Sequence, residues 1–349
     1  PIQVSSLKYH SIEGNGTKII TQTDEFGNNY FLFNRTISEG NNASILINQK
    51  YVITMNEMSF DTNIPEEDIG AYNSSDIIHD LYCQAEPLFE INNPTLISLS
   101  NALVNGLTNP IDKAKAIYNY VSNNIEYEGQ TIGRGALWAY QNKEGDCSEF
   151  SDLMITLLRI QGIPARKCTG MILSNATTAG AAAPNYNLEI GTEWDFHNNF
   201  LKNSASPFAG TLNSTILLHA WLEYYVPNIG WIPCDPTWGS TGYNYFNNMD
   251  FIHLTSNIGA WFEVPSLSDN VSEYSVLPNP VFLSNAVFKY ETLIHVKVLE
   301  VNLIEDNTMI YLITGLIIII ILLIIIYIII KVGKRKKEIK VMYENNSLS

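Results

Sequence analysis

The sequence predicts an α+β protein in which a helix carrying a cysteine packs on an antiparallel sheet carrying a histidine and an aspartate. An apolar run with helical spacing follows Cys147. Two strands separated by a turn signal begin at His219 and end at Asp235. Strand patterns also fill residues 1–62, and 22 uncharged residues at 309–330 add a predicted transmembrane helix to this chain of 349 residues.

Residues 1–62 are predicted to form an accessory β unit. Three segments rich in aromatic and β-branched residues are separated there by glycine and asparagine: 18–22, 30–33 and 45–55. A polar connector at 63–92, which contains a proline and three acidic residues at 65–68, then leads to the core.

Three helices are predicted before residue 162. Asn93 and Asn109 are N-caps of the first two, because each is followed by a proline that suits the first helical turn. Asp146 caps the third, and Glu149 completes a capping box. One apolar face of this third helix is expected to pack inward: Phe150, Leu153, Met154, Leu157 and Leu158. Gly-Ile-Pro at 162–164 ends it.

Cys147 lies in the first turn of the third helix and is the predicted nucleophile. The positive end of the helix dipole favours a thiolate there, although the negative charge of Asp146 opposes it. A thiol nucleophile also needs a base that takes its proton and a third group that holds the base in one tautomer. We therefore expect an imidazolium partner to supply the rest of the activation.

His219 is the predicted base, because it opens an aromatic-rich strand at 219–226. A turn follows, and the return strand ends at Asp235. The residue numbers of His219 and Asp235 are both odd. If the two strands pair odd residues with odd residues, both side chains lie on one face of the sheet, where the aspartate can orient the imidazole. The alternatives are a histidine that bonds a backbone carbonyl and an aspartate that only forms the turn before Pro236.

Four motifs in this order resemble the transglutaminase-like superfamily, in its membrane-anchored prokaryotic type. They are Gly145-Asp146-Cys147, Gly162-Ile163-Pro164-Ala165-Arg166, His219-Ala220-Trp221-Leu222-Glu223 and Gly230-Trp231-Ile232-Pro233-Cys234-Asp235-Pro236-Thr237-Trp238. The resemblance implies a papain-like catalytic core at 93–255, with Cys147 as nucleophile, His219 as base and acid, and Asp235 as orienter. Residues 171–218 exceed a minimal core of that family and are expected to form an insert, either a lid, a substrate-selecting loop or a solvated excursion.

The C-terminal part is predicted to anchor the protein in a membrane. Residues 256–308 form a β extension and juxtamembrane tether, and 309–330 are long enough to cross the hydrocarbon core. The tail at 331–349 contains six basic residues, whereas acidic residues precede the span. The positive-inside rule then puts the tail in the cytoplasm and the N-terminal domain outside. Because the chain begins at Pro1, the lack of a signal peptide shows nothing about export.

Charge and cysteine usage exclude several partners. Without the tail, the chain has 14 basic and 33 acidic residues, a net charge of −19, so we expect no nucleic-acid partner. The four cysteines form no C-x-x-C pair, and neither a metal cluster nor a cofactor is expected; a disulfide among the three other than Cys147 stays open. Seven acceptor sequons fit a glycosylated exterior: Asn15, Asn34, Asn42, Asn73, Asn175, Asn213 and Asn270.

The expected function is a thiol enzyme that cleaves or transfers peptide acyl groups at the cell envelope through a thioester. Hydrolysis is favoured over transfer to an amine, because excluding water needs a dry tunnel that nothing in the sequence indicates. The Cys147 backbone N–H is one expected oxyanion donor, with Tyr127 or Gln130 as the second. The alternative is a non-catalytic surface module for adhesion or binding, which would have no need of an intact cysteine, histidine and aspartate.

Overall fold

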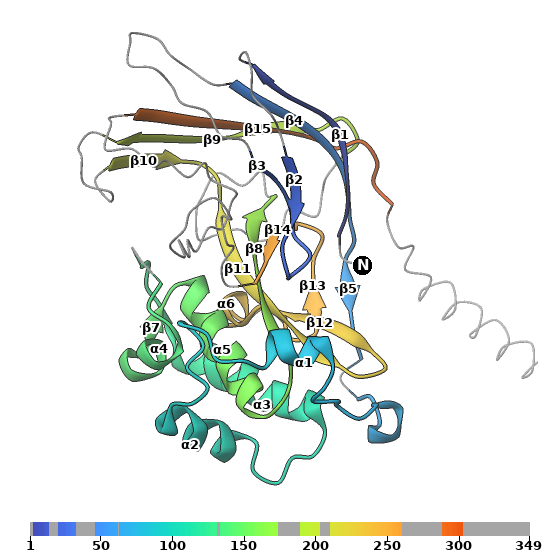
Figure 1. The fold of residues 1–349 in the computed structure, drawn as a ribbon, viewed down its shortest axis with the longest axis vertical. Helices are drawn as coiled ribbons and strands as arrows, with labels where there is room; N and C mark the ends of the chain where they lie inside the picture. The colour runs from blue at the N-terminus through green and yellow to red at the C-terminus, as the bar shows by residue number, and fades with distance from the viewer. Residues whose placement is uncertain are drawn as a thin grey trace, which may run out of the picture. The chain divides into compact units, whose positions relative to one another are not determined.

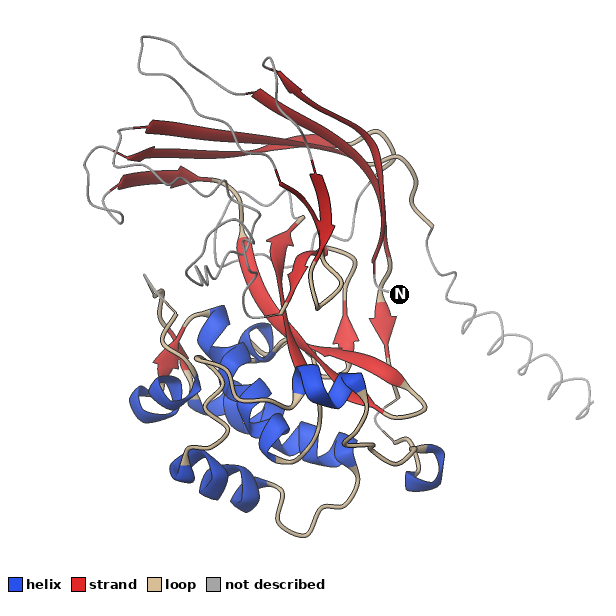
Figure 2. Ribbon diagram, viewed as in Figure 1, coloured by secondary structure: helices blue, strands red, loops and turns tan. Residues whose placement is uncertain are grey.

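The computed structural model describes most of the chain before residue 303, and Figure 1 and Figure 2 show its helices and strands. The described residues are 3–13, 20–32, 46–61, 63–130, 133–173, 189–202, 210–259 and 288–302. They divide into two compact units, 1–187 with 193–296 and 188–192 with 297–349. In the second unit, Val298 O accepts from the N–H of Gly191 and the N–H of Val298 donates to Thr192 O, both at 2.9 Å. The candidate site lies in the first unit.

Helix α5 (Cys147–Ile160) is the central helix of the first unit and contacts α2, α3 and α4. The other helices are η1 (Glu66–Asp68), α1 (Ile77–Tyr82), α2 (Pro94–Leu103), α3 (Pro110–Asn124), α4 (Ala136–Asn142) and α6 (Pro236–Gly239). The predicted N-caps of α2, α3 and α5 are confirmed, because the side chains of Asn93, Asn109 and Asp146 accept hydrogen bonds from the backbone of the first turn.

A four-stranded antiparallel sheet in the order β12-β11-β8-β14 packs against α5 through β8 and β11, and Figure 2 shows the helices gathered beside it. Its strands are β8 (Ala165–Ile172), β11 (Leu218–Val226), β12 (Gly230–Cys234) and β14 (His253–Ile258). The predicted hairpin register is confirmed, because Glu223 pairs with Pro233 and Tyr225 with Trp231. Odd residues of the two strands therefore share a face.

Helix α5 is buried on all sides between Glu149 and Arg159, which corrects the prediction of a single inward face. The apolar positions do pack inward, but the opposite face is covered as well. Its polar groups bond to protein instead of water: Arg159 Nη1 lies 2.6 Å from Glu86 Oε1, and Lys167 Nζ lies 2.8 Å from Asp152 Oδ1. These partners are distant in sequence, so spacing within the helix could not reveal them.

Smaller sheets contain the remaining strands of the described residues. They pair β1 (Gln3–Glu13) with β4 (Leu46–Met55), β2 (Ile20–Thr23) with β3 (Asn29–Leu32), β5 (Met58–Ser59) with β13 (Asn248–Met249), β6 (Glu126–Tyr127) with β7 (Glu144–Gly145), and β9 (Glu193–Lys202) with β10 (Gly210–Ser214) and β15 (Phe288–Lys297). Strands β2, β3 and β4 overlap the three predicted segments, and β1 is an additional strand.

The N-terminal strands are hydrogen-bonded to the core strand β14. Gln3 Nε2 donates to Thr255 O at 3.1 Å, and the N–H of Thr255 donates back to Gln3 Oε1 at 2.9 Å. Asn28 and Ile258 make the same reciprocal pair at 2.8 Å in each direction. Strand β14 therefore extends past the core boundary predicted at 255.

Part of the predicted insert at 171–218 forms the strands β9 and β10. Within β9, Phe196 and Asn198 are buried while Asp195 and His197 are exposed. This alternation with a period of two is the strand signal that the sequence analysis missed. Residues 174–188 and 203–209 of the insert lie outside the described residues.

No helix among the described residues is long and apolar enough to cross a bilayer. The predicted transmembrane helix at 309–330 and the tail at 331–349 lie outside the described residues. Of the predicted β extension and tether at 256–308, residues 256–259 and 288–302 are described, and β15 lies within the second range.

Replacing Lys167 by methionine is expected to destabilise the fold by about 3–5 kcal/mol at neutral pH, because it leaves the fully buried Asp152 without its counter-charge. Burial raises the pKa of Asp152 to about 6 even with Lys167 present. The loss should therefore be smaller at pH 5, where the carboxyl is protonated. Urea unfolding at both pH values measures it, and the double variant Lys167→Met/Asp152→Leu should recover most of the stability; equal losses at both pH values would contradict this.

Candidate active site

The start of α5 holds Cys147 in the first helical turn, as predicted. The carboxylate of Asp146 accepts the N–H of Ser148 at 2.8 Å, and the carboxylate of Glu149 accepts the N–H of Asp146 at 3.0 Å, which completes the capping box. Gly145 is required before it, because a Cβ at this position would collide with the side chain of Glu149.

The four cysteines differ in exposure. Cys147 is half-buried, whereas Cys83, Cys168 and Cys234 are buried, and all four thiols are free. Cys234 precedes Asp235 and is fully buried in the core, because neighbouring residues of a strand face opposite sides. Cys147 is thus the most exposed of the four cysteines.

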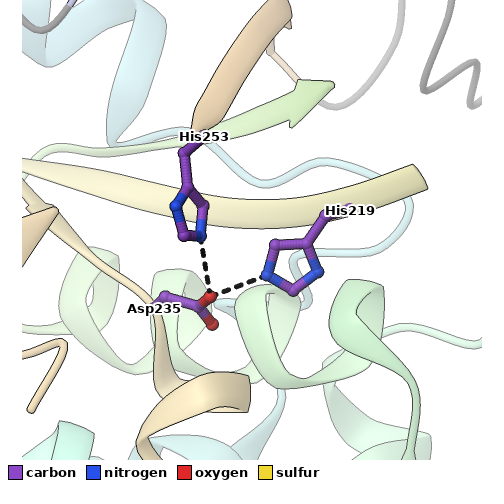
Figure 3. Close-up of side chains that lie close together, drawn as sticks. All are labelled: His219, Asp235 and His253. Atoms are coloured by element: carbon purple, nitrogen blue, oxygen red, sulfur yellow. Dashed lines mark hydrogen bonds and ion pairs between the residues drawn. The ribbon is translucent and has the colours of Figure 1, made fainter. Parts of the chain in front are cut away.

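His219 and Asp235 meet beside the β11–β12 hairpin (Figure 3). His219 Nε2 lies 2.7 Å from Asp235 Oδ2, and both side chains are buried. The other carboxylate oxygen, Oδ1, accepts the backbone N–H groups of Thr237 at 2.9 Å and Trp238 at 3.1 Å. Asp235 therefore caps α6 with one oxygen and contacts the imidazole with the other, so the predicted turn role and orienting geometry occur together.

Cys147 lies near enough to the ring of His219 to contribute to the pKa of that histidine. Because Asp235 occupies Nε2, Nδ1 is the ring nitrogen that remains for a thiol. Burial lowers the pKa of His219, but the charge and hydrogen bond of Asp235, followed by those of Cys147, raise it to about 10. Burial raises the pKa of Asp235, yet His219 and then His253 hold it well below its usual range. At neutral pH His219 is therefore an imidazolium beside an ionised carboxylate.

Two tryptophans flank the ring of His219. The ring centroid of Trp221 lies 5.9 Å away in a stacked arrangement, and that of Trp238 lies 5.5 Å away. Aromatic faces attract a nearby cation and keep water from it. Trp231 packs on Arg166 instead, with the guanidinium carbon 3.9 Å from the ring centroid.

A second histidine, His253, approaches the same carboxylate (Figure 3). Its Nε2 lies 3.4 Å from Asp235 Oδ2, and its Nδ1 lies 2.6 Å from Asp250 Oδ1. His253 had no predicted role. Its approach to Asp235 depends on β14 lying beside β8.

Residues 97–236 match the family model of the Transglutaminase-like superfamily. The matched segment contains Cys147, His219 and Asp235, whose geometry is described above. This segment belongs to the transglutaminase-like superfamily. The mixed α/β arrangement of sheet and helices around the segment is the fold that the resemblance implied.

Two curated relatives match part of this chain. The uncharacterized protein YebA of Bacillus subtilis is 30% identical over 150 residues, which are 41% of this chain and 17% of YebA. An uncharacterized protein of Haemophilus influenzae is 26% identical over 138 residues, 37% of this chain and 32% of that protein. The chain therefore spans less than a third of the length of each. A candidate cysteine protease from Cytophaga hutchinsonii has a similar structure, with a TM-score of 0.43 and 13% identity, over 86% of this chain and 82% of that one.

The two predicted second oxyanion donors of the transglutaminase-like core are placed differently. The Gln130 side chain is engaged, because its Nε2 donates to Glu128 O at 3.0 Å. Tyr127 lies on β6, which pairs with β7 directly before the capped helix, and is 61% exposed. Burial, and then the charges of Cys147 and Asp146, raise the pKa of Tyr127 to about 12. Tyr127 thus keeps its proton at neutral pH, although its donor role stays a prediction.

His219, Asp235 and His253 also form, among the described residues, the one group of three metal-ligating side chains whose ligand atoms lie within 4.8 Å of one another. Imidazole and carboxylate ligands of this kind suit zinc. The distances of 2.7 Å and 3.4 Å between these residues fit hydrogen bonds between their ring nitrogens and the carboxylate. The expectation of no metal stays a prediction.

Glu149 is expected to make the transglutaminase-like fold less stable as the pH rises from about 5 to 8. Burial, opposed by the Arg134 N–H and reinforced by Asp146, raises its pKa from 4.5 to about 7. Because the folded state binds this proton more tightly than the unfolded state, unfolding free energy falls as pH rises through that window. Urea unfolding of Glu149→Gln should lack this component of the slope, whereas Ser148→Ala should keep it; identical slopes in wild type and Glu149→Gln would contradict the assignment.

Proposed function

We propose that this protein is a thiol-dependent acyl-transfer enzyme that uses Cys147, His219 and Asp235. The observation that carries the proposal is the contact of 2.7 Å between His219 Nε2 and Asp235 Oδ2, with Cys147 near enough to raise the pKa of His219. A thiol nucleophile, a base and an orienting group that act together need such an arrangement. Cysteine-protease chemistry is the class that the family and this geometry support.

The proposed reaction begins when the Cys147 thiolate attacks the carbonyl carbon of a peptide amide. His219 donates its Nδ1 proton to the nitrogen as the C–N bond breaks, so an amine leaves and a thioester remains. The neutral imidazole then takes a proton from water, and the hydroxide attacks the thioester. The carboxylic acid departs, and the thiolate and imidazolium are restored. With an amine in place of water, the same step yields a new amide.

Hydrolysis is the favoured outcome, since Cys147 is half-buried and water reaches it. The test incubates the full-length chain in detergent with envelope peptides, with and without a primary amine, and identifies the products by mass. Hydrolysed peptide supports a peptidase or amidase, and amine adducts in excess would shift the proposal to transfer. If the folded protein yielded neither product, both hydrolysis and transfer to an amine would be contradicted.

The competing proposal, a non-catalytic surface module for adhesion or binding, predicts an unactivated thiol. Iodoacetamide distinguishes the two without a substrate. We expect Cys147 to be alkylated at pH 6 much faster than a free thiol, because it lies in the first turn of α5 and near the ring of His219. Alkylation no faster than that of a free thiol would favour the binding module.

We also propose that the enzyme is held at the outer face of a cell membrane by residues 309–330, with the tail 331–349 in the cytoplasm. The support is the length of the uncharged stretch and the basic residues that follow it. Such an anchor would restrict substrates to proteins and peptides of the envelope. Protease added to intact cells should digest the N-terminal domain and spare an epitope placed after Ser349; digestion of the epitope would reverse the orientation.

A further inference from the structure

His253 has a carboxylate oxygen at each of its two ring nitrogens. Nδ1 faces Asp250 at 2.6 Å, and Nε2 faces Asp235 at 3.4 Å. A neutral imidazole has one N–H donor and one bare nitrogen. If His253 were neutral, it would turn a lone pair toward one of the two carboxylates. Only the imidazolium donates to both, so the geometry requires a cation here.

The groups around His253 fit that charge. Asp250 and Asp235 face it as carboxylates, the hydroxyl of Tyr245 donates to the far oxygen of Asp250, and the ring of His219 lies 5.6 Å away between centroids. The side chain of His253 is fully buried. Burial lowers the pKa of His253, but Asp250 and then Asp235 raise it above its ordinary value. The imidazoliums of His219 and His253 thus face the carboxylates of Asp235 and Asp250, and the two positive charges balance the two negative charges.

The carboxylate of Asp235 is held at both oxygens. Oδ1 accepts two backbone N–H groups from the start of α6. Oδ2 is shared between the Nε2 atoms of His219 and His253 (Figure 3). Without His253, Oδ2 would be fixed only by His219, the ring that must gain and lose a proton during the reaction. A second donor keeps the oxygen in place while the charge of His219 changes.

We propose that His253, clamped by Asp250, is a positioning residue that holds Asp235 in the orientation needed by His219. The proposal rests on the thiol chemistry proposed above. It has a second, electrostatic consequence. Because Asp235 shares its negative charge with two cations, His219 holds its proton less tightly than it would beside Asp235 alone. His219 can then return the proton to the leaving amine.

Two amide substitutions separate the two contacts of His253. In His253→Gln the amide nitrogen lies near the position of Nε2 and keeps a donor toward Asp235. In His253→Asn it lies near the position of Nδ1 and keeps a donor only toward Asp250. We measure the rate of Cys147 alkylation by iodoacetamide from pH 5 to 10 in the full-length protein, together with thermal unfolding.

We expect His253→Asn to slow alkylation at pH 6 by about tenfold, as for loss of a hydrogen bond to a charged group, and His253→Gln to stay within about threefold of wild type. His253→Gln should also move the alkaline limb of the profile to higher pH, because a cation near His219 has been removed. The reverse ranking would mean that the contact with Asp250 matters instead, and equal rates in the two variants would mean that neither contact controls the reactivity of Cys147. Either result would overturn the proposal.

A measurement on the wild-type protein keeps the proposal testable if either variant fails to fold. In ¹⁵N-histidine-labelled protein at pH 7, both nitrogens of His253 should carry protons, and Nε2–H should show coupling to a carboxylate acceptor. A single protonated nitrogen would overturn the proposal. Neither readout requires a substrate. Absence of peptide products with these signatures intact would therefore count against the proposed function and leave the positioning role standing.

Discussion

Replacing Cys147 by alanine is expected to lower peptide hydrolysis by about 10⁴-fold or more, because the attacking atom and the thioester are both lost. Serine at this position should not rescue it. A hydroxyl is far less acidic than a thiol and does not ionise beside an imidazolium. The fold should be preserved, since Cys147 is half-buried and the cap of α5 is made by its neighbours. Steady-state hydrolysis and thermal unfolding of the full-length protein measure the two effects.

Cys83→Ala is the matched control for this experiment. Cys83 is a free thiol at the end of α1, buried and outside the triad, so its removal should leave hydrolysis unchanged. Iodoacetamide should inactivate wild type and Cys83→Ala at the same rate. If Cys147→Ala hydrolysed peptides within tenfold of wild type, the nucleophile would be another group and the proposed mechanism would fall.

Much of this site could be predicted because its helix caps and its hairpin depend on residues that are close in sequence. The caps of α2, α3 and α5 each depend on residues within three positions of one another, so they can be read without a fold. The hairpin that carries His219 also follows from a short turn and from parity, because a register with period two fixes which side chains share a face. Three residues far apart in sequence could be assigned roles because each belongs to a motif of its own.

What sequence reasoning missed depends on contacts between distant segments. His253 approaches Asp235 because β14 is added to the far edge of β8, and no local pattern specifies that neighbour. The pair of Lys167 and Asp152 likewise joins a strand to a helix. These polar side chains would be expected at the surface from the sequence alone. In the structure they are buried together with the groups that they bond. The reciprocal bonds of Gln3 and Asn28 to β14 belong to the same class.

Asp235→Asn is expected to lower hydrolysis by about 10⁴-fold while leaving the protein folded. The asparagine oxygen can still cap α6, because Oδ1 receives the N–H groups of Thr237 and Trp238. Its NH₂ group then faces His219 Nε2, which must become an acceptor. The ring proton is forced to Nδ1, toward Cys147, and neutral His219 can no longer take the thiol proton. The pKa of His219 should fall as well, since the charge that raises it is gone.

The pH dependence of stability provides the control for that interpretation. The folded-state pKa of His219 lies above its ordinary 6.5, at about 10, so its ion pair with Asp235 stabilises the fold fully below pH 6.5 and is lost as pH rises through 10. The gap in unfolding free energy between wild type and Asp235→Asn should therefore be widest near pH 6 and narrow toward pH 10. Asp76→Asn, at the exposed N-cap of α1, should show no such gap. A gap that stayed constant with pH would mean that Asp235 acts mainly as a helix cap, and a folded, fully active Asp235→Asn would remove it from the mechanism.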